Sequence, residues 1–525
     1  MPIYGALNPL QGSDFTIAET RVAAGHPSAT LDVGLEARLV RMEIITMADT
    51  QRPFRHTKIV ATIGPATETL EKLESLIRAG VDIIRLNMAH GSVQWVGEII
   101  ARVRQASQNV GRHVAIMMDV KGPEVRTGPV DAPIELKVGD RLELHTQPFD
   151  AVDDGVHRVS VNYPDLPADV AVGATVLIDS GLLRTKVLET TDHLVVLEVL
   201  TPGTLGSRRH INLPGTRINL PALTKKDEAD LCAGVAAGLD FVALSFVRQA
   251  ADIVTLREFL DELSSCAKII AKIEDQAGVE NMEEIIHESD GVMVARGDLG
   301  IEIEYHKLPL VQTELVNACQ VQGKPVIIAT HLLESMIQSP IPTRAEISDV
   351  SNAIREQADA IMLSGETTMG AYPLESVEVL KNIVQSIEPS VDGQINRRIR
   401  LHTPKAKMLR SSVVLAKELG RAGVVVFTRS GFLAYVLGAM RAQEVPIYAF
   451  TDIPSTFHQL MLPWGVEPFL MDFSDDPERT IQNALGRLKE RGWCSPGEWL
   501  VVITNALADD KIIDTLQLRQ VNGDS

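Results

Sequence analysis

The stretch AKIEDQAGVENMEEIIHESDGVMVARGDLGIEI, Ala271 to Ile303, contains two short apolar runs separated by a segment with helical periodicity. Lys272 and Glu274 alternate with apolar neighbours on the first run, and Asp298 follows the second run directly after an Arg-Gly pair. A strand, a helix and a second strand in this order form the repeating unit of parallel sheets. An ammonium and two carboxylates at the ends of otherwise apolar strands predict a site for a metal ion and an anion.

The same alternation of apolar runs and helical segments continues on both sides of this unit. It predicts eight strands, at residues 57–64, 82–89, 113–120, 240–247, 268–275, 291–298, 325–332 and 360–367. Their near-continuous apolar character is typical of parallel strands that are covered on both faces. Eight such strands with helices between them predict an α/β fold, the closed (β/α)8 or TIM barrel, and an open doubly wound sheet is the alternative.

The spacing of these strands indicates further domains in a chain of 525 residues. The gap between the third and fourth strands is far too long for one crossover, and its short alternating runs predict an all-β insert that can act as a lid. A second strand–helix alternation follows the barrel. We therefore expect an N-terminal extension of unknown role (1–55), a catalytic barrel (56–123 and 220–390), a β lid domain (124–219) and a C-terminal α/β domain (391–525).

Composition restricts the classes of partner. The formal net charge of −19 argues against nucleic acid and against a membrane surface, which both favour a basic face. The four cysteines lie far apart, without the spacing of a zinc site. No run has the apolar length of a membrane span, and the N-terminus lacks the pattern of a signal peptide. We expect a cytoplasmic protein that meets an anionic substrate with local cations or a metal ion.

Polar residues are concentrated at the carboxyl ends of the predicted strands, where barrel enzymes place their active sites. Arginine suits bidentate contact with phosphate oxygens, and two carboxylates that face one gap suit Mg²⁺ or Mn²⁺. Together these side chains predict a site for a phosphorylated acid. In strand order they are Arg85, Asn87 and His90; Asp119, Lys121 and Arg126; Lys272 and Glu274; Arg296 and Asp298; Thr330; and Ser364 and Glu366.

Each of these residues also has a purely structural interpretation. Lys272 and Glu274 can form a structural ion pair, and Asp298 can cap a helix. Arg85 can satisfy loop carbonyls, and Asp119 can pair with a neighbouring lysine. The convergence of all of them on one end of the barrel favours the functional interpretation.

Several motifs, in order along the chain from Thr57, resemble those of pyruvate kinases. They include TKIVATIGPA (57–66), IIRLNMAHG (83–91), MDVKGPEVRTG (118–128), VMVARGDLGIEI (292–303), KPVIIATHLLESM (324–336) and IMLSGET (361–367). The resemblance implies a barrel, a β lid after the third strand, an allosteric C-terminal regulatory domain and a homotetramer. It also implies the glycolytic transfer of the phosphoryl group of phosphoenolpyruvate to ADP, which gives ATP and pyruvate.

The resemblance implies roles for the residues at the barrel mouth. Glu274 and Asp298 would hold Mg²⁺ (or Mn²⁺) between the carboxylate and phosphoryl oxygens of the substrate. Lys272 would stabilise the charge that develops as the bond breaks. Backbone N–H groups at Gly297 and Asp298 would bind the substrate carboxylate. Thr330 would help to bind substrate and belong to the network that protonates the enolate.

Further residues are implied to contact phosphate and nucleotide. Arg85 would contact the phosphoryl group as a catalytic and substrate-binding residue. Arg208 and Arg209 occupy the position of a family lysine pair and would clamp nucleotide phosphates when the lid closes. The remaining nucleotide-binding residues are Thr62 and Pro65, near the adenosine, together with Asn87, His90 and Arg126.

Two other functions remain open at this point. A metal-dependent lyase that stabilises a pyruvate enolate on a related barrel would use similar arginines and carboxylates, but it would need neither the basic lid nor the C-terminal domain. A catalytically inactive regulatory relative is suggested by an altered cation loop. Intact Lys272, Glu274, Asp298 and Thr330 argue against the inactive relative.

The C-terminal domain contains the sequence FTRSGFLA, which resembles an effector-phosphate loop of allosteric family members. Its residues Thr428, Arg429, Ser430 and Gly431 offer hydroxyl and N–H groups to a phosphate. Apolar residues follow, and a late loop at 505–515 contains two aspartates, Asp509 and Asp510, which repel phosphate. These features disfavour a sugar bisphosphate, whereas a sugar monophosphate, a nucleotide or no effector remain open.

The loop that resembles the family's monovalent cation site departs from the usual pattern. The common Asn-Phe-Ser-His-Gly is Asn-Met-Ala-His-Gly here, from Asn87 to Gly91, so a serine hydroxyl that ligates K⁺ is replaced by Ala89. Asp119 and Val120, the latter through its carbonyl, would complete the site with Asn87. Glu124, by contrast, matches the glutamate of K⁺-dependent members.

We predict that K⁺ still activates the protein but with a weaker affinity than in relatives that keep the serine. The reason is that the loss of one oxygen ligand weakens a hard-cation site unless another oxygen replaces it. A K⁺ titration of the activity measures this. Full activity in K⁺-free Tris buffer would contradict the prediction, and so would full activation at the low K⁺ concentrations that suffice for relatives.

Overall fold

The computed structural model describes residues 54–149, 155–391, 395–420, 422–508 and 511–521. They belong to one compact unit, Pro53–Ser525. Apart from its last two residues, the extension expected at 1–55 lies outside the described residues, and so do Asp509 and Asp510.

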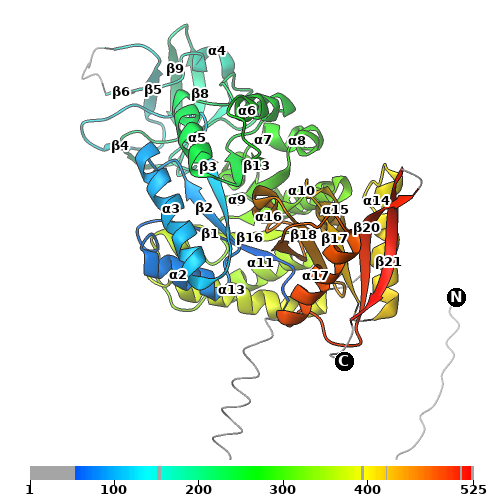
Figure 1. The fold of residues 1–525 in the computed structure, drawn as a ribbon. Coiled ribbons are helices and arrows are strands. Elements are labelled where there is room, and N and C mark those ends of the chain that lie inside the picture. The colour runs from blue at the N-terminus through cyan, green and yellow to red at the C-terminus, as the bar shows by residue number, and fades with distance from the viewer. Residues whose placement is uncertain (1–53, 150–154, 392–394, 421, 509–510, 522–525) are drawn as a thin grey trace, which may run out of the picture. The chain divides into compact units, whose positions relative to one another are not determined.

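Eight parallel strands form a closed barrel in the order β1-β16-β15-β14-β13-β12-β3-β2 (Figure 1). All but two of their residues are buried, because helices cover the outside and side chains fill the inside. This confirms the predicted (β/α)8 barrel and excludes the open sheet. The strands are β1 (Lys58–Thr62), β2 (Ile83–Asn87), β3 (Ala115–Val120), β12 (Phe241–Leu244), β13 (Lys268–Ile273), β14 (Gly291–Ala295), β15 (Val326–Ala329) and β16 (Ala360–Leu363).

Several of the helices between the strands begin at side chains that cap their free N–H groups. Thr224 and Thr343 start their helices with capping boxes, closed by Asp227 and Glu346. No helix of the described residues is long and apolar enough to cross a membrane. The helices are α2 (Leu70–Ala79), α3 (Val93–Val110), α5 (Lys225–Ala237), α6 (Ala250–Glu262), α7 (Gln276–Glu280), α8 (Met282–Glu288), α9 (Arg296–Glu302), α10 (Leu308–Gln322), α11 (Arg344–Arg355), α12 (Gly365–Thr368) and α13 (Pro373–Ile387), with short 3₁₀ turns η1 (Tyr305–Lys307), η2 (Glu334–Ile337) and η3 (Glu388–Ser390).

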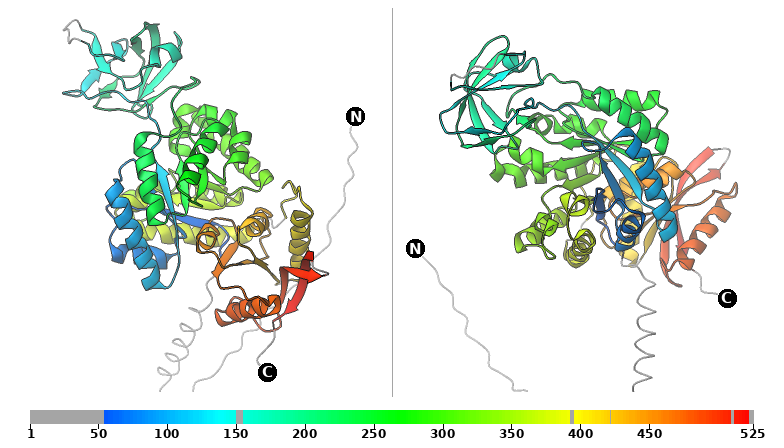
Figure 2. Two further views of the ribbon diagram at one scale, coloured as in Figure 1. Left: turned by 45° about the horizontal axis from the view of Figure 1, so that its top comes forward. Right: turned by 90° about the vertical axis from the view of Figure 1, so that its left-hand side faces the viewer.

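The lid domain is inserted between β3 and α5 and has a hydrophobic core of its own. A six-stranded sheet in the order β11-β7-β8-β9-β5-β6 and a two-stranded sheet β10-β4 build it (Figure 2). The expectation of a β insert is confirmed, with the short α4 (Leu166–Asp169) as an addition. The strands are β4 (Ile134–Leu136), β5 (Arg141–His145), β6 (His157–Ser160), β7 (Thr175–Ile178), β8 (Leu183–Thr190), β9 (Leu194–Val199), β10 (Gly203–Leu205) and β11 (Ile211–Asn212).

The C-terminal domain is a five-stranded sheet in the order β19-β18-β17-β20-β21. Core clusters with α14 and α15 on one face and with α17 on the other show that both faces are covered. The elements are α14 (Pro404–Leu419), β17 (Gly423–Phe427), α15 (Phe432–Ala439), β18 (Ile447–Thr451), α16 (Pro454–Gln459), β19 (Val466–Leu470), α17 (Pro477–Glu490), β20 (Trp499–Ala508) and β21 (Lys511–Gln520).

One sequence-based expectation for this domain is wrong. The segment at 505–515 is not a loop, because most of it belongs to β20 and β21, which pair antiparallel from Trp499↔Gln520 to Ala508↔Lys511. Inter-strand hydrogen bonds along the whole hairpin outweigh the local turn composition that suggested a loop.

The C-terminal domain closes the amino end of the barrel. Phe457, Met461 and Leu462, from α16 and the turn after it, belong to the same buried cluster as the inward-facing barrel residues Phe241 and Met293. This leaves the carboxyl ends of the strands as the accessible end of the barrel.

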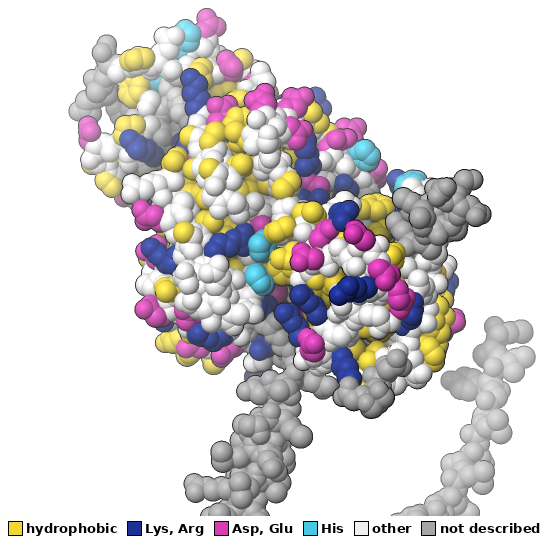
Figure 3. Space-filling model, in the orientation of Figure 1, with side chains coloured by type: hydrophobic (Ala, Val, Ile, Leu, Met, Phe, Trp, Pro, Cys, Tyr) yellow, Lys and Arg dark blue, Asp and Glu magenta, His cyan; other side chains and the backbone are white. Residues whose placement is uncertain are grey.

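Charges on the molecular surface are mixed. On the face shown in Figure 3, basic and acidic side chains of the described residues are interspersed. Exposed pairs such as Arg519–Glu478 and Arg429–Asp452 are examples. Exposed pairs of this kind contribute little to stability because water and salt screen them.

We predict that Arg441→Met strongly lowers the free energy of unfolding. Arg441 and Asp359 form a fully buried bidentate pair between the C-terminal domain and the barrel, with Nη1–Oδ1 at 2.8 Å and Nη2–Oδ2 at 2.5 Å. Removing one partner leaves a buried, uncompensated carboxylate, and the expected loss is about 3–5 kcal/mol. Urea denaturation followed by circular dichroism measures it.

Arg429→Met is the matched control, because Arg429 also donates from two nitrogen atoms to an aspartate, Asp452, but does so at the surface. Its loss of stability should be much smaller. Equal losses in the two variants would show that burial of the Arg441 pair has no special effect.

Candidate active site

The ammonium group of Lys272 is the centre of a buried polar cluster at the carboxyl ends of the barrel strands. Its Nζ lies 2.8 Å from Glu274 Oε1, 3.0 Å from Asp119 Oδ1 and 2.7 Å from Ser245 Oγ. Burial opposes its charge, but Asp119 and Glu274 outweigh this and raise the pKa of Lys272. A permanent positive charge is therefore held at the barrel mouth.

Arg85 lies beside this cluster and is fixed on two sides. Its Nε donates to Asp119 Oδ2 at 2.7 Å, and its Nη1 donates to Thr62 Oγ1 at 3.0 Å. Burial opposes ionisation of Asp119, but Arg85 and Lys272 outweigh it and hold the pKa of this carboxyl below its usual range. One carboxylate thus orients two cations.

Thr62 lies below Arg85 and is fully buried. Its hydroxyl donates to the Leu363 carbonyl at 2.9 Å and accepts from Arg85. The structure therefore places the Thr62 side chain against Arg85, whereas the neighbouring Pro65 is exposed. Thr62 is the last residue of β1 and Pro65 follows the strand; the sequence predicts an adenosine contact at both positions.

Glu274 is buried directly after β13, and its second oxygen accepts the Phe246 N–H at 2.8 Å. Burial raises the pKa of Glu274 to about 7; Lys272 opposes the shift, and the carboxylates of Asp298 and Asp119 add to it. A divalent cation would relieve exactly this accumulation of negative charge, so the residues fit a metal site.

A metal ion at this place would have few protein ligands. No group of three or more His, Cys, Asp or Glu side chains with metal-binding geometry exists among the described residues. Glu274 and the half-buried Asp298 on α9 would therefore supply two carboxylates. Mg²⁺ commonly takes one or two protein carboxylates and completes its octahedron with water and substrate oxygens.

Thr330 and Gly297 are in direct contact. The Gly297 N–H donates to Thr330 Oγ1 at 2.7 Å, and Thr330 Oγ1 donates to the Ala329 carbonyl at 2.7 Å. A Cβ at Gly297 would lie 3.3 Å from Thr330 Oγ1, which is a tight approach. Thr330 has a φ of +67°, and Arg296 holds its carbonyl at 2.8 Å. The threonine hydroxyl is thus fixed at the start of α9, next to Asp298.

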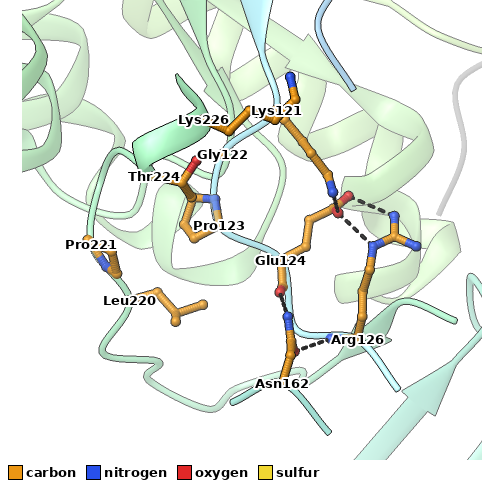
Figure 4. A pocket seen from close by; sticks show the side chains of 10 residues that line it. All are labelled: Lys121, Gly122, Pro123, Glu124, Arg126, Asn162, Leu220, Pro221, Thr224 and Lys226. Carbon is orange, nitrogen blue, oxygen red and sulfur yellow. Dashed lines mark hydrogen bonds and ion pairs between the residues drawn. The ribbon is translucent and has the colours of Figure 1, made fainter. Parts of the chain in front are cut away.

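Arg126 lies at the hinge between barrel and lid. Its guanidinium donates to Glu124 from Nε at 2.7 Å and from Nη2 at 3.0 Å, and its Nη1 donates to the Arg208 carbonyl at 2.8 Å. Figure 4 shows Lys121 and Arg126 both directed at the Glu124 carboxylate, beside a cavity of about 310 Å³. Asn162 of the lid joins this hinge through two hydrogen bonds to the backbone of Glu124 and Arg126.

Other predicted nucleotide contacts lie at the surface. His90 is exposed, as are Arg208 and Arg209 on the lid. Arg209 pairs with Asp179 at 3.3 Å, also on the lid. Among the described residues, no hydrogen bond or ion pair joins the side chains of Arg208 and Arg209 to the Lys272 cluster.

The predicted monovalent cation residues are adjacent but already engaged. Asn87 pairs in register with Asp119. Its Oδ1 accepts the Ala89 N–H at 3.1 Å, and the Val120 carbonyl accepts the Ser245 hydroxyl at 2.7 Å. Both oxygens of Asp119 face cationic side chains. The structure thus brings the three residues together and gives each an internal partner.

Sequence reasoning missed two residues at the exit of β12. Ser245 donates to Val120 and contacts Lys272, and Phe246 holds Glu274 through its backbone. The sequence contains a signal for Ser245: among predicted strands two to eight, only the fourth had no polar residue assigned to its carboxyl end. Ser245 is the hydroxyl residue that stands there.

Comparison with known proteins agrees with this geometry. The family model for the barrel domain of pyruvate kinase matches residues 54–377, and the model for its alpha/beta domain matches residues 406–516. The chain belongs to the pyruvate kinase family. It is therefore an enzyme, a phosphotransferase with pyruvate kinase function, and neither the lyase nor the inactive relative is favoured.

Individual pyruvate kinases match most of the chain. The pyruvate kinase of Geobacillus stearothermophilus is 40% identical over 458 residues, which cover 86% of this chain and 77% of the relative. That of Bacillus licheniformis is 38% identical over 472 residues, 87% of this chain and 79% of the relative. A crystal structure of a pyruvate kinase from Cryptosporidium parvum has a TM-score of 0.84 at 35% identity and covers 89% of this chain and 96% of that chain.

The predicted effector loop in this pyruvate kinase family member is a tight turn. Thr428 Oγ1 accepts the Gly431 N–H at 3.0 Å, and Ser430 Oγ accepts the Phe432 N–H at 3.4 Å. Arg429 makes a bidentate contact with Asp452, with Nη2–Oδ2 at 2.7 Å. The four predicted residues lie together, and the arginine has an acidic partner within the domain.

We predict that Mn²⁺ affinity falls as the pH decreases through about 7. Glu274, whose pKa is raised to about 7, is neutral below that pH, and a metal ion binds only the carboxylate. Affinity should be about tenfold lower at pH 6 than on the plateau above pH 8, with release of a proton on binding. Calorimetric titrations in buffers of different ionisation enthalpy measure both effects. A constant affinity from pH 6 to 8 would contradict the prediction.

Proposed function

We propose that this pyruvate kinase family member transfers the phosphoryl group of phosphoenolpyruvate to ADP with Lys272 as the main catalytic cation. The observation that supports this most is the buried ammonium itself, held by Asp119, Glu274 and Ser245 at the barrel mouth. In the reaction the bond between the enol oxygen and phosphorus breaks, and a β-phosphate oxygen of ADP bonds to phosphorus. The resulting enolate takes a proton at carbon and becomes pyruvate.

Lys272 acts on the charge that develops during this transfer. Its fixed ammonium stabilises negative charge on the phosphoryl oxygens and on the enolate oxygen, without reorganisation of solvent. Arg85, oriented by Asp119 and Thr62, binds the phosphoryl group from the neighbouring strand. Both cations are positioned before substrate arrives, because Asp119 binds them together.

Glu274 and Asp298 would hold Mg²⁺ or Mn²⁺ at this site. Such an ion would supply Lewis-acid stabilisation of the negative charge on substrate oxygens. The N–H groups of Gly297 and Asp298 bind the substrate carboxylate. To do so, the Gly297 N–H gives up its hydrogen bond to Thr330 Oγ1 and donates to the carboxylate instead. The released Thr330 hydroxyl then contacts substrate and joins the proton-delivery network.

Nucleotide binding involves the hinge and the lid. Arg126 contacts a phosphate from the hinge, while Arg208 and Arg209 reach the phosphates when the lid closes. Pro65 contributes to the adenosine side, and Thr62 acts through Arg85. Asn87, at the end of β2, and His90, which follows it, also contribute to nucleotide binding.

Further properties belong to the same proposal. K⁺ binds near Asn87, Asp119 and the Val120 carbonyl. A phosphate-containing effector would bind at residues 428–431, where it must compete with Asp452 for Arg429. We also propose a cytoplasmic homotetramer, as the family membership suggests.

The deciding experiment is pyruvate production from phosphoenolpyruvate, with ADP, Mg²⁺ and K⁺ varied independently. We expect pyruvate to appear only with ADP and in equal amount with ATP. Pyruvate formation without ADP would indicate the lyase chemistry instead.

Lys272→Met should lower kcat by at least about 10²- to 10³-fold, because it removes a preorganised charge from the transition state. Lys268→Met is the matched control: Lys268 lies at the other end of the same strand, 3.2 Å from Asp290. It should keep most of the activity. A Lys272→Met protein with full turnover would overturn the assignment.

A further inference from the structure

The two connections between lid and barrel run side by side at the barrel mouth. Arg126, on the outgoing connection, and His210, on the returning one, form an antiparallel bridge. The returning connection continues into β11, where Asn212 donates to Glu302 at the end of α9 at 2.8 Å. The segment around His210 is thus joined to the outgoing connection at Arg126 and to α9 of the barrel at Glu302.

Phe246 connects this pair of segments with Glu274. Its backbone has a φ of +54°, a strained value for a phenylalanine, and its N–H donates to Glu274 Oε2 at 2.8 Å. A strained backbone of this kind persists only where surrounding contacts hold it. The contacts that fix the Phe246 ring therefore also fix the hydrogen bond to Glu274.

The returning lid connection contacts the Phe246 ring through His210. The imidazole of His210 lies 5.8 Å from it between ring centroids, at an interplanar angle of 51°. On the outgoing side, a Cβ at Gly122, which has a φ of +69°, would lie 3.1 Å from Ser245 Cβ and 3.4 Å from the Phe246 ring, so this connection passes near the ring. A displacement of His210 with the lid would therefore change the packing around Phe246.

The His210 ring acts here as a neutral, half-buried aromatic group. Burial lowers its pKa, although Glu124 and Asp298 partly oppose this, while Arg126 and Lys121 add to it. A neutral imidazole packs on phenylalanine as an aromatic ring does, and such pairs are favourable at centroid distances of 4.5–7 Å. Ring packing rather than charge is thus the interaction that the geometry offers.

We propose that His210 is a positioning residue that couples the lid to the metal-binding carboxylate: its ring holds Phe246, and Phe246 holds Glu274. The coupling rests on the proposed role of Glu274 as a ligand of the divalent cation. With the ring in place, Glu274 is oriented before the cation binds. Without it, part of the binding free energy must first order Phe246 and Glu274.

Three variants test this coupling. His210→Ala removes the ring, His210→Phe keeps a ring without nitrogen atoms, and His193→Ala alters an exposed histidine elsewhere on the lid. The first readout is Mn²⁺ affinity without substrate, measured from the electron paramagnetic resonance signal of free Mn²⁺. We expect the Kd to rise about 2- to 10-fold in His210→Ala and to stay within about twofold in the other two.

The second readout needs no metal ion. Hydrogen–deuterium exchange of the peptide that contains Phe246 should accelerate in His210→Ala, because the Phe246 N–H loses protection, and remain unchanged in His210→Phe and His193→Ala. Unchanged exchange in His210→Ala would overturn the coupling. So would a His210→Phe protein that resembles His210→Ala, because the nitrogen atoms rather than the ring would then matter.

Glu274→Gln separates this inference from the proposed function. An unchanged Mn²⁺ affinity in Glu274→Gln would overturn the assignment of Glu274 as a metal ligand. Accelerated exchange in His210→Ala would in that case still support the contact chain from lid to Glu274. If Glu274→Gln abolishes Mn²⁺ binding while His210→Ala changes neither readout, only the coupling fails.

Discussion

The burial of the Lys272 ammonium is the constraint on which the active site depends. A buried charge is costly unless it is paired and hydrogen-bonded. Lys272 meets this requirement with Asp119, Ser245 and Glu274. Glu274 follows the strand of Lys272 itself, whereas Asp119 and Ser245 lie at the ends of β3 and β12. The strands must therefore keep their register around the closed barrel. The same contacts that stabilise the lysine also hold its charge at the barrel mouth, where the proposed mechanism uses it.

Asp119 extends this arrangement to the neighbouring strand. Because Asp119 binds Lys272 with one oxygen and Arg85 with the other, the two cations lie close together despite their repulsion. Glu274 differs from Lys272, because burial and nearby carboxylates disfavour its charged form and raise its pKa. A bound divalent cation would balance the negative charge of these carboxylates. In the proposed mechanism, the two cations bind anionic substrate oxygens and the carboxylates bind a divalent cation.

The two ends of the barrel have different functions. The C-terminal domain fills the amino end with Phe457, Met461 and Leu462 and is joined to it by the buried Arg441–Asp359 pair. The lid is connected at the carboxyl end through a small set of polar and aromatic contacts. A large apolar interface resists motion, whereas a small hinge with polar contacts permits it. This difference suits a rigid base and a movable lid.

The sequence by itself determined the barrel, the position of the β insert and the strand exits that carry Lys272, Glu274 and Asp298. Periodicity reveals these features because the two periods of helix and strand are local properties of the chain. The tertiary structure alone decided the partners: Ser245 and Phe246 beside the lysine and glutamate, Thr62 below its arginine, and β21 in place of a loop. Such contacts join residues that are far apart in the sequence, and a local sequence pattern does not specify which of them meet in the fold.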